Sequence, residues 1–583
     1  MTRLRASRLS SILFSCPKRI HTSRTRYTIA RRSPTMTSES PRPNLEPVLD
    51  RLASLETQIE ELRSIGGNAG LSIGVAHKGT SIFEKHFGFR NVNSATPPDS
   101  ETVQHIGSMT KAFVAAAAAS LVEDGKLSWE TPLGESGVVP LFCESNTEPE
   151  NKSLPQVNLL DLLAHRLGVA MKQSYWHLMS TALLSEKANT AHIVSKLPPV
   201  AEFRSKMSYN NWGYALVGQV IEHVSGQDLG QFIAQRFFEP LGLKNTTLGK
   251  PSSENYAASY MALSDGTPFQ VEHPPLNSGT VMAPAGAMKS TMSDMLVLYS
   301  ALLEAFQNQS LSDATSKHTS PFRQATALFA KHSTIQPGSA YGMGWCLTEL
   351  PDQAGLVGVN SYESPDGMPV IGKDTKPQRL FYHNGAMCGA LSAVYLLPDS
   401  DFVVVVLGNS FDLYDTPDFA AQLVIEAIIG VPNPVDFIPI AKKTVANALS
   451  HHPDMNAQLE KERTQGTSPK ALSEYAGYYT SAEGSDYGFQ VSVLQEKLRV
   501  NIQGIADVFY DLEHYEHDVF AFYCDRDAES KRMIYPNASI MMHKFFFEAD
   551  EQGKVLHVRW AHDFTYPSGE LFKKGRAPST LKL

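Results

Sequence analysis

One segment constrains the fold of this chain more than any other: residues 106–120 read IGSMTKAFVAAAAAS. The successive alanines at residues 115–119 favour a helix and present no bulky side chain on any face. A helix of such small residues can be enclosed closely by its neighbours. The segment therefore predicts a central, buried helix, and a chain of 583 residues has ample material to surround it.

The same segment places Ser108 three residues before Lys111. Three residues are nearly one helical turn, so both side chains share a face if the helix begins near Ser108. A helix N-terminus stabilises an alkoxide, and a desolvated lysine can act as a neutral base. The structural alternative is that Ser108 caps the helix while Lys111 is solvated. The same spacing occurs at Ser15 and Ser579, but neither of these precedes an apolar helical segment.

A second serine matches a different hydrolase pattern. Residues 70–74, GLSIG, fit the GxSxG turn in which a nucleophilic serine links a strand to a helix. Here Ser72 lies inside an alternating run that leads into a hairpin. We therefore expect Ser72 to point into a sheet face and not to act as a nucleophile.

Charge and composition exclude several classes of protein. With a net charge of -9 and an isoelectric point near 6.1, the chain has no general basic field for nucleic acid. No apolar run approaches the roughly 20 residues that cross a bilayer, so we expect no membrane span. The five cysteines are scattered without CxxC spacing, which indicates neither a disulfide framework nor a zinc site and fits a reducing compartment.

The first 44 residues differ in composition from the rest. No acidic residue precedes Glu39, while basic residues and serines are frequent, as in an organellar transit peptide. The alternatives are an extension without function before Met36, or a secretory segment, for which the apolar stretch is short. We expect residues 1–44 to be a disordered or transit-like extension of a mitochondrial or cytoplasmic protein.

Periodicity along the remainder predicts an α+β domain at residues 45–430. An amphipathic helix at residues 45–62 precedes a hairpin at residues 71–89, and strand-like runs return at residues 379–409. An antiparallel sheet built from both ends of a domain, with helices inserted between, is the expected layout. The inserted and following helices are expected at residues 112–123, 158–164, 214–224, 294–306 and 418–429.

Two further regions follow this domain. Residues 431–469 end in the polar run TQGTSP and are expected to form a linker. Residues 470–583 contain several short aromatic and β-branched runs separated by turns, which predict a small all-β barrel-like domain.

Three motifs in order along the chain carry a family resemblance. Ser108 and Lys111 form an SxxK pattern, Tyr209 and Asn211 form a YxN pattern within SYNNWGYALVG, and residues 383–385 read HNG. Together with their flanking residues they resemble the serine β-lactamase and penicillin-binding-protein-like superfamily, especially its class C-related esterase and D-peptidase branch. The resemblance implies a β-lactamase-like antiparallel sheet flanked by a helical region. Residues 512–522 are similar to the lipocalin-like domain appended to many members.

Two departures from the family pattern bear on function. A stretch that usually reads LLTHTSGL is LLAHRLGV here, which puts the loop near Arg166 in doubt. The third motif has His383 where true β-lactamases carry a lysine that helps to bind the carboxylate of penicillin-type substrates. Antibiotic hydrolysis is therefore not the expected physiological role.

The resemblance implies a nucleophile and its proton-transfer partners. Ser108 attacks an ester, amide or lactam carbonyl after losing its proton to Lys111, to Tyr209 or to both acting together. Lys111 is expected to lower the pKa of Tyr209 and hold it partly as phenolate. Tyr209 then protonates the leaving group and activates the water or alcohol that releases the acyl group.

The resemblance also implies the substrate-binding residues. The backbone N–H groups of Ser108 and Ala386 form the oxyanion hole, beside Gly385. Asn211 bonds Lys111 or the substrate amide. His383 orients the network or binds a polar substrate group, unless it is only a strand histidine satisfied by a neighbour.

Several functions remain open from the sequence. The first is hydrolysis of a small-molecule acyl substrate, an ester, amide or D-amino-acid peptide, with no metal and no other cofactor. The second is acyl transfer to an alcohol or amine by the same residues. The third is a scaffold or protease like mitochondrial relatives of this family. The barrel-like domain is either a passive cap or a lid that shapes the substrate entrance, and the oligomeric state is open.

Overall fold

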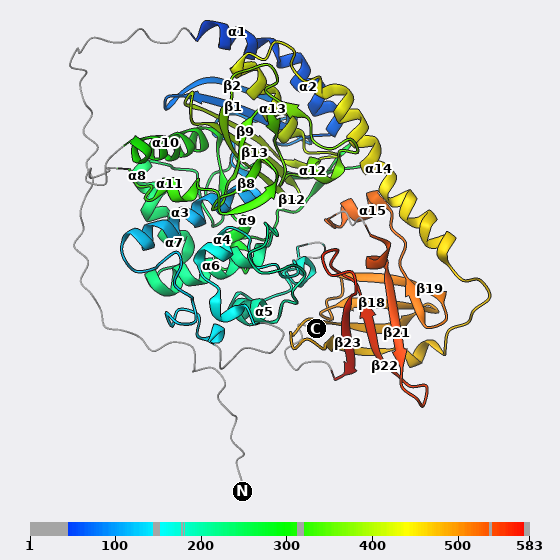
Figure 1. Cartoon of the computed structure of the whole chain (residues 1–583). Coiled ribbons are helices and arrows are strands. Elements are labelled where there is room, and N and C mark those ends of the chain that lie inside the picture. The colour runs from blue at the N-terminus through cyan, green and yellow to red at the C-terminus, as the bar shows by residue number, and fades with distance from the viewer. Residues whose placement is uncertain are drawn as a thin grey trace, which may run out of the picture. The chain divides into compact units, whose positions relative to one another are not determined.

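The computed structural model describes residues 45–143, 152–176, 179, 181–311, 320–535 and 539–576. Residues 45–583 form one compact unit, in which an α+β domain is followed along the chain by a closed β-barrel (Figure 1). This architecture confirms the predicted fold class. The extension expected at residues 1–44 lies outside the described residues. Among the helices of the described ranges, none has the length and hydropathy needed to cross a membrane.

The α+β domain is built on an eight-stranded sheet with the strand order β2-β1-β14-β13-β12-β9-β8-β7. All neighbouring strands are antiparallel. Because β1 pairs with β14, with Leu71 opposite Gly408, the N-terminal hairpin joins the last long strand of the domain. The sheet is thus assembled from both ends of the domain, as predicted. The strands are β1 Gly70–His77, β2 Thr80–Gly88, β7 Ser333–Gln336, β8 Ser339–Tyr341, β9 Cys346–Leu350, β12 Gln378–Met387, β13 Ala390–Leu397 and β14 Phe402–Gly408.

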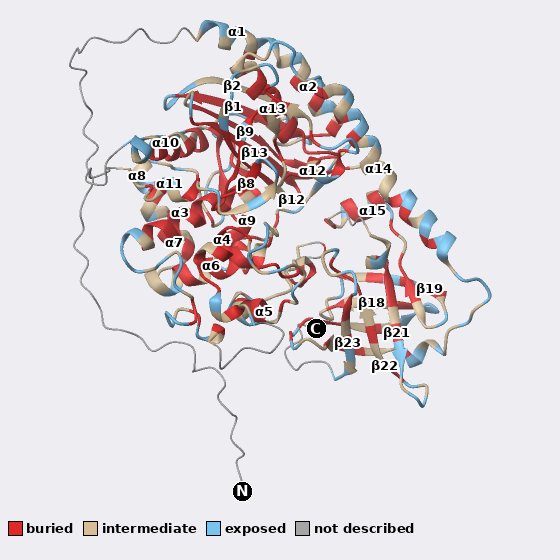
Figure 2. Cartoon of the chain, in the orientation of Figure 1, coloured by how far each residue is buried: buried red, intermediate tan, exposed pale blue. Residues whose placement is uncertain are grey.

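Helices cover both faces of this sheet, and its central strands are buried throughout (Figure 2). On β14, Val404 and Val406 contribute to one hydrophobic cluster and Val403 and Val405 to another, because successive side chains point to opposite faces. The first cluster includes residues of α1 Glu46–Ser54, α2 Glu56–Gly66, α13 Thr416–Ile429 and α14 Phe437–Glu462. The second includes residues of α10 Met292–Leu311.

The glycines of the GLSIG stretch serve packing of the sheet. A Cβ on Gly74 would lie 2.9 Å from Leu296 Cδ1, so a side chain there would have to displace side chains of α10 that pack on β1. Ser72 is fully buried within β1, and its hydroxyl bonds His86 Nδ1 at 2.9 Å. The strand continues through Ser72 to His77, so the residue has no strand-to-helix turn, as predicted.

The alanine-rich segment forms α3 Thr110–Glu123, and residues 115–119 are completely buried. α3 packs against α6 Asn211–Ser225 and α9 Ala283–Gly286. Gly213 of α6 also lies close to the backbone of Leu162, since a Cβ on Gly213 would lie 2.9 Å from the carbonyl oxygen of Leu162. The other helices are α4 Leu159–Leu163, α5 Thr190–Lys196, α7 Leu229–Ile233, α8 Glu239–Leu241, α11 Ala325–Leu328 and α12 Asn360–Glu363.

Short strands complete the domain: β3 Gln104–His105 pairs with β6 Lys289–Ser290, β10 Asp352–Gln353 pairs with β11 Val370–Ile371, and β4 Ser259–Ala262 lies between β5 Pro268–Val271 and β15 Ser410–Phe411. Two expected elements differ in detail. The helix expected at residues 45–62 is divided at Leu55 into α1 and α2. The expected linker at residues 431–469 contains the 26-residue helix α14.

The C-terminal domain is a closed barrel in which each strand pairs with the next and β16 pairs with β23. Aromatic side chains fill it: the ring of Phe489 lies 4.8 Å from that of Phe572, and Phe545 stacks on Trp560 at 4.7 Å. The strands are β16 Gly477–Ser481, β17 Gly488–Leu494, β18 Lys497–Ile502, β19 Phe509–Glu516, β20 Val519–Ala521, β21 Lys544–Ala549, β22 Val555–Trp560 and β23 Glu570–Gly575.

Residues 522–535 and 539–543, between β20 and β21, form an excursion that we call the barrel insertion; it contains α15 Arg526–Lys531. The insertion contacts the α+β domain. Arg526 Nη1 donates to the carbonyl of Ala262 at 2.7 Å, and the thiol of Cys388 donates to the carbonyl of Met533 at 3.2 Å. These contacts bring the insertion to the end of β12.

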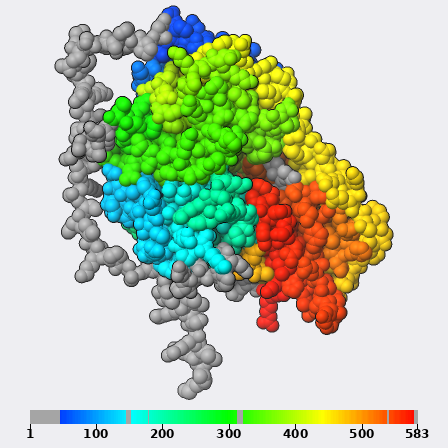
Figure 3. All heavy atoms as spheres, viewed as in Figure 1, coloured from blue at the N-terminus to red at the C-terminus, as the bar shows by residue number. Residues whose placement is uncertain are grey.

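A second contact between the barrel and the α+β domain is made by a buried ion-pair network. Lys172 Nζ pairs with Glu570 and, at 2.8 Å, with Glu483. His562 Nε2 bonds Glu570 Oε2 at 2.7 Å, and Tyr175 donates to Glu570 Oε1 at 2.6 Å. Burial raises the pKa of Glu570, but Lys172 and His562 outweigh it and keep the carboxyl ionised. In Figure 3, red residues near the C-terminus adjoin cyan and teal residues of the α+β domain.

Candidate active site

Ser108 lies in a 3₁₀ turn, Gly107–Met109, that runs directly into α3. Gly107 has φ +49°, and a Cβ there would lie 2.9 Å from the backbone nitrogen of Ala386. Only glycine therefore allows this turn to lie against β12. The N-cap of α3 is Met109 without a side-chain cap, so Ser108 is not a capping residue. Its side chain remains half-buried.

Lys111 occupies the first turn of α3 and is completely buried. Its Nζ lies 2.8 Å from Ser108 Oγ and 2.8 Å from the carbonyl oxygen of Ala285. Burial lowers the pKa of Lys111 well below the usual lysine value. A neutral amine keeps two N–H donors and one lone pair, so it can donate to Ala285 and accept the proton of Ser108.

Tyr209 lies in the loop before α6, close enough to Ser108 for the serine hydroxyl to affect the pKa of the phenol. Lys111 Nζ lies 5.0 Å from the centre of the Tyr209 ring. Burial raises the pKa of Tyr209, and the nearby Ser108 hydroxyl offsets this only in part. The expected lowering of the Tyr209 pKa is therefore wrong in direction, because desolvation favours the neutral phenol.

Asn211 is the first residue of α6, whose N-cap is Asn210. The Oδ1 atom of Asn211 is buried and has no hydrogen-bond partner among the described residues. The expected bond to Lys111 is not formed: the hydrogen-bond partners of that amine among the described residues are Ser108 Oγ and the carbonyl of Ala285. An unpartnered buried amide oxygen is costly, and a donor on a bound ligand would remove this cost.

His383, Gly385 and Ala386 follow one another on β12. Pairing of β12 with β9 ends at Tyr382, which leaves the edge at residues 383–387 open to the turn that carries Ser108. A Cβ on Gly385 would collide with the carbonyl of Ile106, so this position also requires glycine. The Ala386 backbone nitrogen thus lies next to the Ser108 turn, where the two expected oxyanion donors can converge.

His383 is buried and held at both ring nitrogens. Its Nε2 bonds the hydroxyl of Tyr341 at 2.9 Å, and its Nδ1 donates to the carbonyl of Asn384 at 2.6 Å. Burial, with Lys111 nearby, lowers the pKa of His383 to about 3. The imidazole is therefore neutral at physiological pH, and both of its nitrogens already have partners. This arrangement matches the expectation of a histidine satisfied by its neighbours.

His165 was not identified from the sequence, although it lies within the divergent LLAHRLGV stretch. Its ring packs 4.4 Å from that of Tyr209 and 4.8 Å from that of Tyr341. Its carbonyl accepts from Ser208 N, and its Nδ1 accepts from Asn210 N at 3.1 Å. His165 thus fixes the backbone on both sides of Tyr209. An exceptional φ of +55° could not be read from the sequence.

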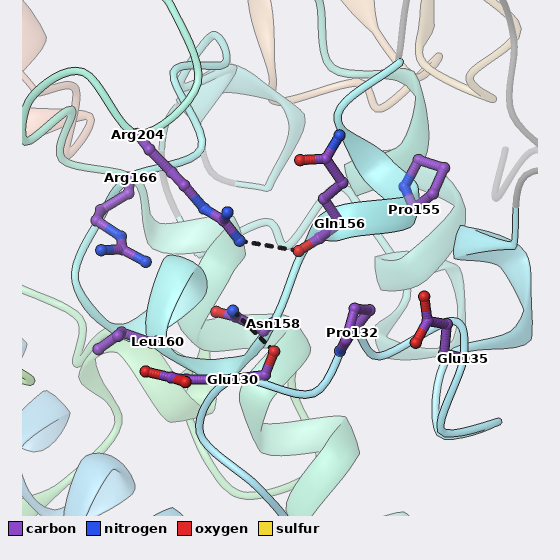
Figure 4. A pocket seen from close by; sticks show the side chains of 9 residues that line it. All are labelled: Glu130, Pro132, Glu135, Pro155, Gln156, Asn158, Leu160, Arg166 and Arg204. Atoms are coloured by element: carbon purple, nitrogen blue, oxygen red, sulfur yellow. Dashed lines mark hydrogen bonds between the residues drawn. The ribbon is translucent and has the colours of Figure 1, made fainter.

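Arg166, the other departure in this stretch, has a structural role. Its guanidinium pairs with Asp161, which is fully buried and also pairs with Arg204. These arginines line a surface pocket together with Glu130, Pro132, Glu135, Pro155, Gln156, Asn158 and Leu160 (Figure 4). None of the seven predicted site residues lines this pocket. In this chain, therefore, ion pairs with Asp161 hold the loop that contains His165.

The barrel insertion contributes a wall near these residues. Tyr535 and Ala386 both pack against one small apolar cluster that includes Cys388 and Met533. Tyr535 is also close enough to Tyr209 to raise the pKa of that phenol. Its hydroxyl bonds that of Tyr362 at 2.6 Å. A residue of the C-terminal domain therefore borders the Ser108 site.

Relatives of the chain include two fungal proteins and one bacterial enzyme. The chain is 26% identical to unguisins hydrolase ungD of Aspergillus violaceofuscus over 42% of its own length and 44% of that protein. It is 24% identical to unguisins hydrolase ungD' of Aspergillus campestris over 58% of each chain. Thus it spans about half the length of these curated relatives. A β-lactamase of Pseudomonas fluorescens is 24% identical over 61% of this chain and 92% of the relative.

The chain is also similar to a solved structure, and it matches two family models. The octameric penicillin-binding protein homologue from Pyrococcus abyssi shares the fold, with a TM-score of 0.52, 20% identity, and coverage of 90% of this chain and 100% of the other. Residues 461–573 match the domain of unknown function DUF3471. Residues 55–428, more than half of the chain, match the Beta-lactamase family model. The chain therefore belongs to the β-lactamase family.

Proposed function

We propose that the protein is a serine hydrolase that forms a covalent acyl intermediate on Ser108. The observation that carries this proposal is the contact of Lys111 Nζ with Ser108 Oγ at 2.8 Å, made by an amine whose pKa burial lowers well below the usual lysine value. A neutral amine within bonding distance of a hydroxyl is the arrangement that activates a serine nucleophile. The chain is similar in sequence to two proteins named as unguisins hydrolases, and this similarity supports hydrolysis as the reaction.

Acylation begins when Lys111 takes the proton of Ser108 and Oγ attacks the substrate carbonyl. The carbonyl π electrons move to oxygen, where the N–H groups of Ser108 and Ala386 stabilise the negative charge; one such donor is typically worth about 3 kcal/mol. When the tetrahedral adduct collapses, the phenol of Tyr209 protonates the leaving group. Tyr209 then recovers a proton from Lys111, which restores both neutral groups.

Deacylation follows the same proton path in reverse. Lys111, directly or through Tyr209, takes a proton from water as the water oxygen attacks the acyl carbonyl. The second adduct collapses, the acid departs, and Ser108 Oγ receives the proton. An alcohol in place of water would give an ester, so the same residues serve acyl transfer.

Two features support an ester, amide or D-amino-acid-type peptide as substrate. The unpartnered Oδ1 of Asn211 can accept a substrate amide N–H. The neutral, doubly bonded His383 provides no positive charge for the carboxylate of a penicillin-type substrate. We therefore propose that β-lactam hydrolysis is not the principal activity.

A panel of p-nitrophenyl esters, D-amino-acid anilides and a chromogenic cephalosporin tests this proposal. We expect turnover of esters or anilides that Ser108→Ala abolishes while far-UV circular dichroism stays unchanged. Ser72→Ala, at the buried serine of β1, is the matched control and should retain activity. Activity lost in Ser72→Ala but kept in Ser108→Ala would refute the proposal. Added alcohol distinguishes transfer, since a transferase forms the new ester faster than the free acid.

A further inference from the structure

Three metal-ligating side chains meet where α14 adjoins the barrel insertion, and His543 lies beside one of them, Cys524. His452 comes from α14, Cys524 and Glu529 from the insertion, and His543 from the short turn before β21. All four residues are buried, with exposures of 4%, 7%, 8% and 0%. Imidazole, thiolate and carboxylate are the ligand types that zinc takes in proteins.

The distances within this cluster suit a single small cation. Ligand atoms of His452, Cys524 and Glu529 all lie within 4.8 Å of one another. Cys524 Sγ lies 3.4 Å and 3.8 Å from the two ring nitrogens of His543. Tetrahedral zinc bonds of about 2.0–2.1 Å to nitrogen and about 2.3 Å to sulfur place those ligand atoms about 3.6 Å apart. His452 Nε2 and Glu529 Oε2 are closer, at 2.8 Å, and would separate slightly around an ion.

The hydrogen bonds around the cluster leave ligand atoms available. Nδ1 of His543 lies 3.2 Å from the carbonyl of Phe522, a contact of the kind that orients zinc-binding imidazoles. Donation there leaves the Nε2 lone pair of His543 for a ligand. The Nδ1 of His452 is buried without a hydrogen-bond partner in the described part of the chain. When Nε2 of His452 donates to Glu529, its Nδ1 therefore keeps a lone pair that no described hydrogen-bond donor reaches.

We propose that His452, Cys524, Glu529 and His543 bind a structural zinc ion. On binding, the ion displaces the proton of the Cys524 thiol to solvent and forms the Zn–S bond. The resulting thiolate and the Glu529 carboxylate balance the two positive charges of zinc, so the buried site is electrically neutral. Four protein ligands leave no open position, as in structural rather than catalytic zinc sites.

The proposed ion would tie α14 to both ends of the barrel insertion. Cys524 and Glu529 lie near its start and His543 at its end. The insertion also carries Tyr535, which borders the Ser108 site. Zinc would thus fix the position of this wall, but its binding does not depend on the proposed hydrolase function.

Metal content of the full chain, purified after growth with zinc, provides the first test. We expect stoichiometric zinc by inductively coupled plasma mass spectrometry and a fall in the thermal unfolding midpoint on chelation. Replacement by Co²⁺ should produce a thiolate-to-cobalt charge-transfer band, which reports cysteine ligation without any mutation. Cys524→Ser should lose this band, whereas Cys143→Ser, at a cysteine outside the cluster that donates to the carbonyl of Gly134, should keep it.

Two results would contradict zinc binding at this cluster. Substoichiometric zinc together with no charge-transfer band in cobalt-treated wild-type protein would show that the cluster is only a hydrogen-bonded one. A band that persists in Cys524→Ser would place the metal elsewhere. Because the cobalt spectrum is recorded on the wild-type chain, a folding defect in the variant does not obscure the result.

Discussion

The Nζ atom of Lys111 lies 2.8 Å from the Oγ atom of Ser108, and the lysine side chain is completely buried. These two facts belong together, since burial is what makes the amine a base. An exposed lysine one turn into a helix would be protonated and would only donate to the serine. In this chain the alanines of α3 allow the surrounding helices to exclude water from the amine.

The protonation of Lys111 should set the acidic limb of the pH–rate profile. Below its folded pKa the amine is protonated and cannot accept the serine proton, so kcat/KM should rise with pH as the amine becomes neutral. We expect the apparent pKa of this limb to lie well below about 10.4. His383, with a pKa of about 3, does not titrate in that range. Lys111→Arg, always charged, should be inactive throughout, and a limb at the ordinary lysine value would contradict the burial argument.

Tyr209 should matter most for substrates with poor leaving groups. As a neutral phenol it acts as an acid toward the departing atom, and p-nitrophenolate leaves without protonation. Tyr209→Phe should therefore slow anilide hydrolysis by about 100-fold or more, the usual scale of general acid catalysis, and p-nitrophenyl ester hydrolysis by less than about tenfold. Single-turnover acylation rates separate these cases. Equal losses for both substrate types would indicate a role in positioning alone.

His165 should act as a positioning residue for the Tyr209 loop. His165→Ala removes the ring contact and the acceptor of the Asn210 N–H, so we expect kcat to fall about tenfold or more with a smaller change in KM. His165→Asn supplies an acceptor and tolerates the positive φ, and should restore part of kcat. If both variants match the wild type in kcat, the loop is fixed by other contacts.

Tyr535 decides between the two roles left open for the barrel. If the insertion shapes the substrate entrance, Tyr535→Ala should raise the kcat/KM ratio of long-chain to short-chain acyl esters by about tenfold, the discrimination typical of one methylene-sized contact. Tyr535→Phe keeps the ring and loses only the bond to Tyr362, so its ratio should stay near the wild-type value. An unchanged ratio in Tyr535→Ala would support a passive cap.

The periodicity of the sequence and the order of its motifs were sufficient to predict the two folded domains and the pairing of Ser108 with Lys111. The strand-like runs at residues 379–409 and the hairpin at residues 71–89 predicted a sheet assembled from both ends of the domain, and the aromatic runs after residue 470 predicted the barrel. Ser108 and Lys111 could be paired because their spacing is local, one helical turn. Their context, five small residues that can be packed closely, predicted a buried helix, while burial of the lysine itself remained one of two alternatives.

The remaining features depend on contacts between distant segments. The pKa of Tyr209 is raised because the side chain is buried. The sequence prediction considered only the charge of Lys111 near Tyr209 and so gave the opposite direction. Tyr535 reaches the site only because the insertion between β20 and β21 contacts β12. The proposed zinc ligands are spread over residues 452–543 without a motif spacing, so the scattered cysteines gave no signal.

The most direct test of the account is the mass of the enzyme during turnover. Acid quenching with a slowly deacylated p-nitrophenyl ester, followed by peptide mass spectrometry, should show one acyl group on the peptide that contains Ser108. Ser108→Ala should show none, and Lys111→Arg should accumulate it far more slowly. Acylation of another residue, or turnover by the wild type with no acylated peptide under conditions that trap one in a control serine hydrolase, would contradict the account.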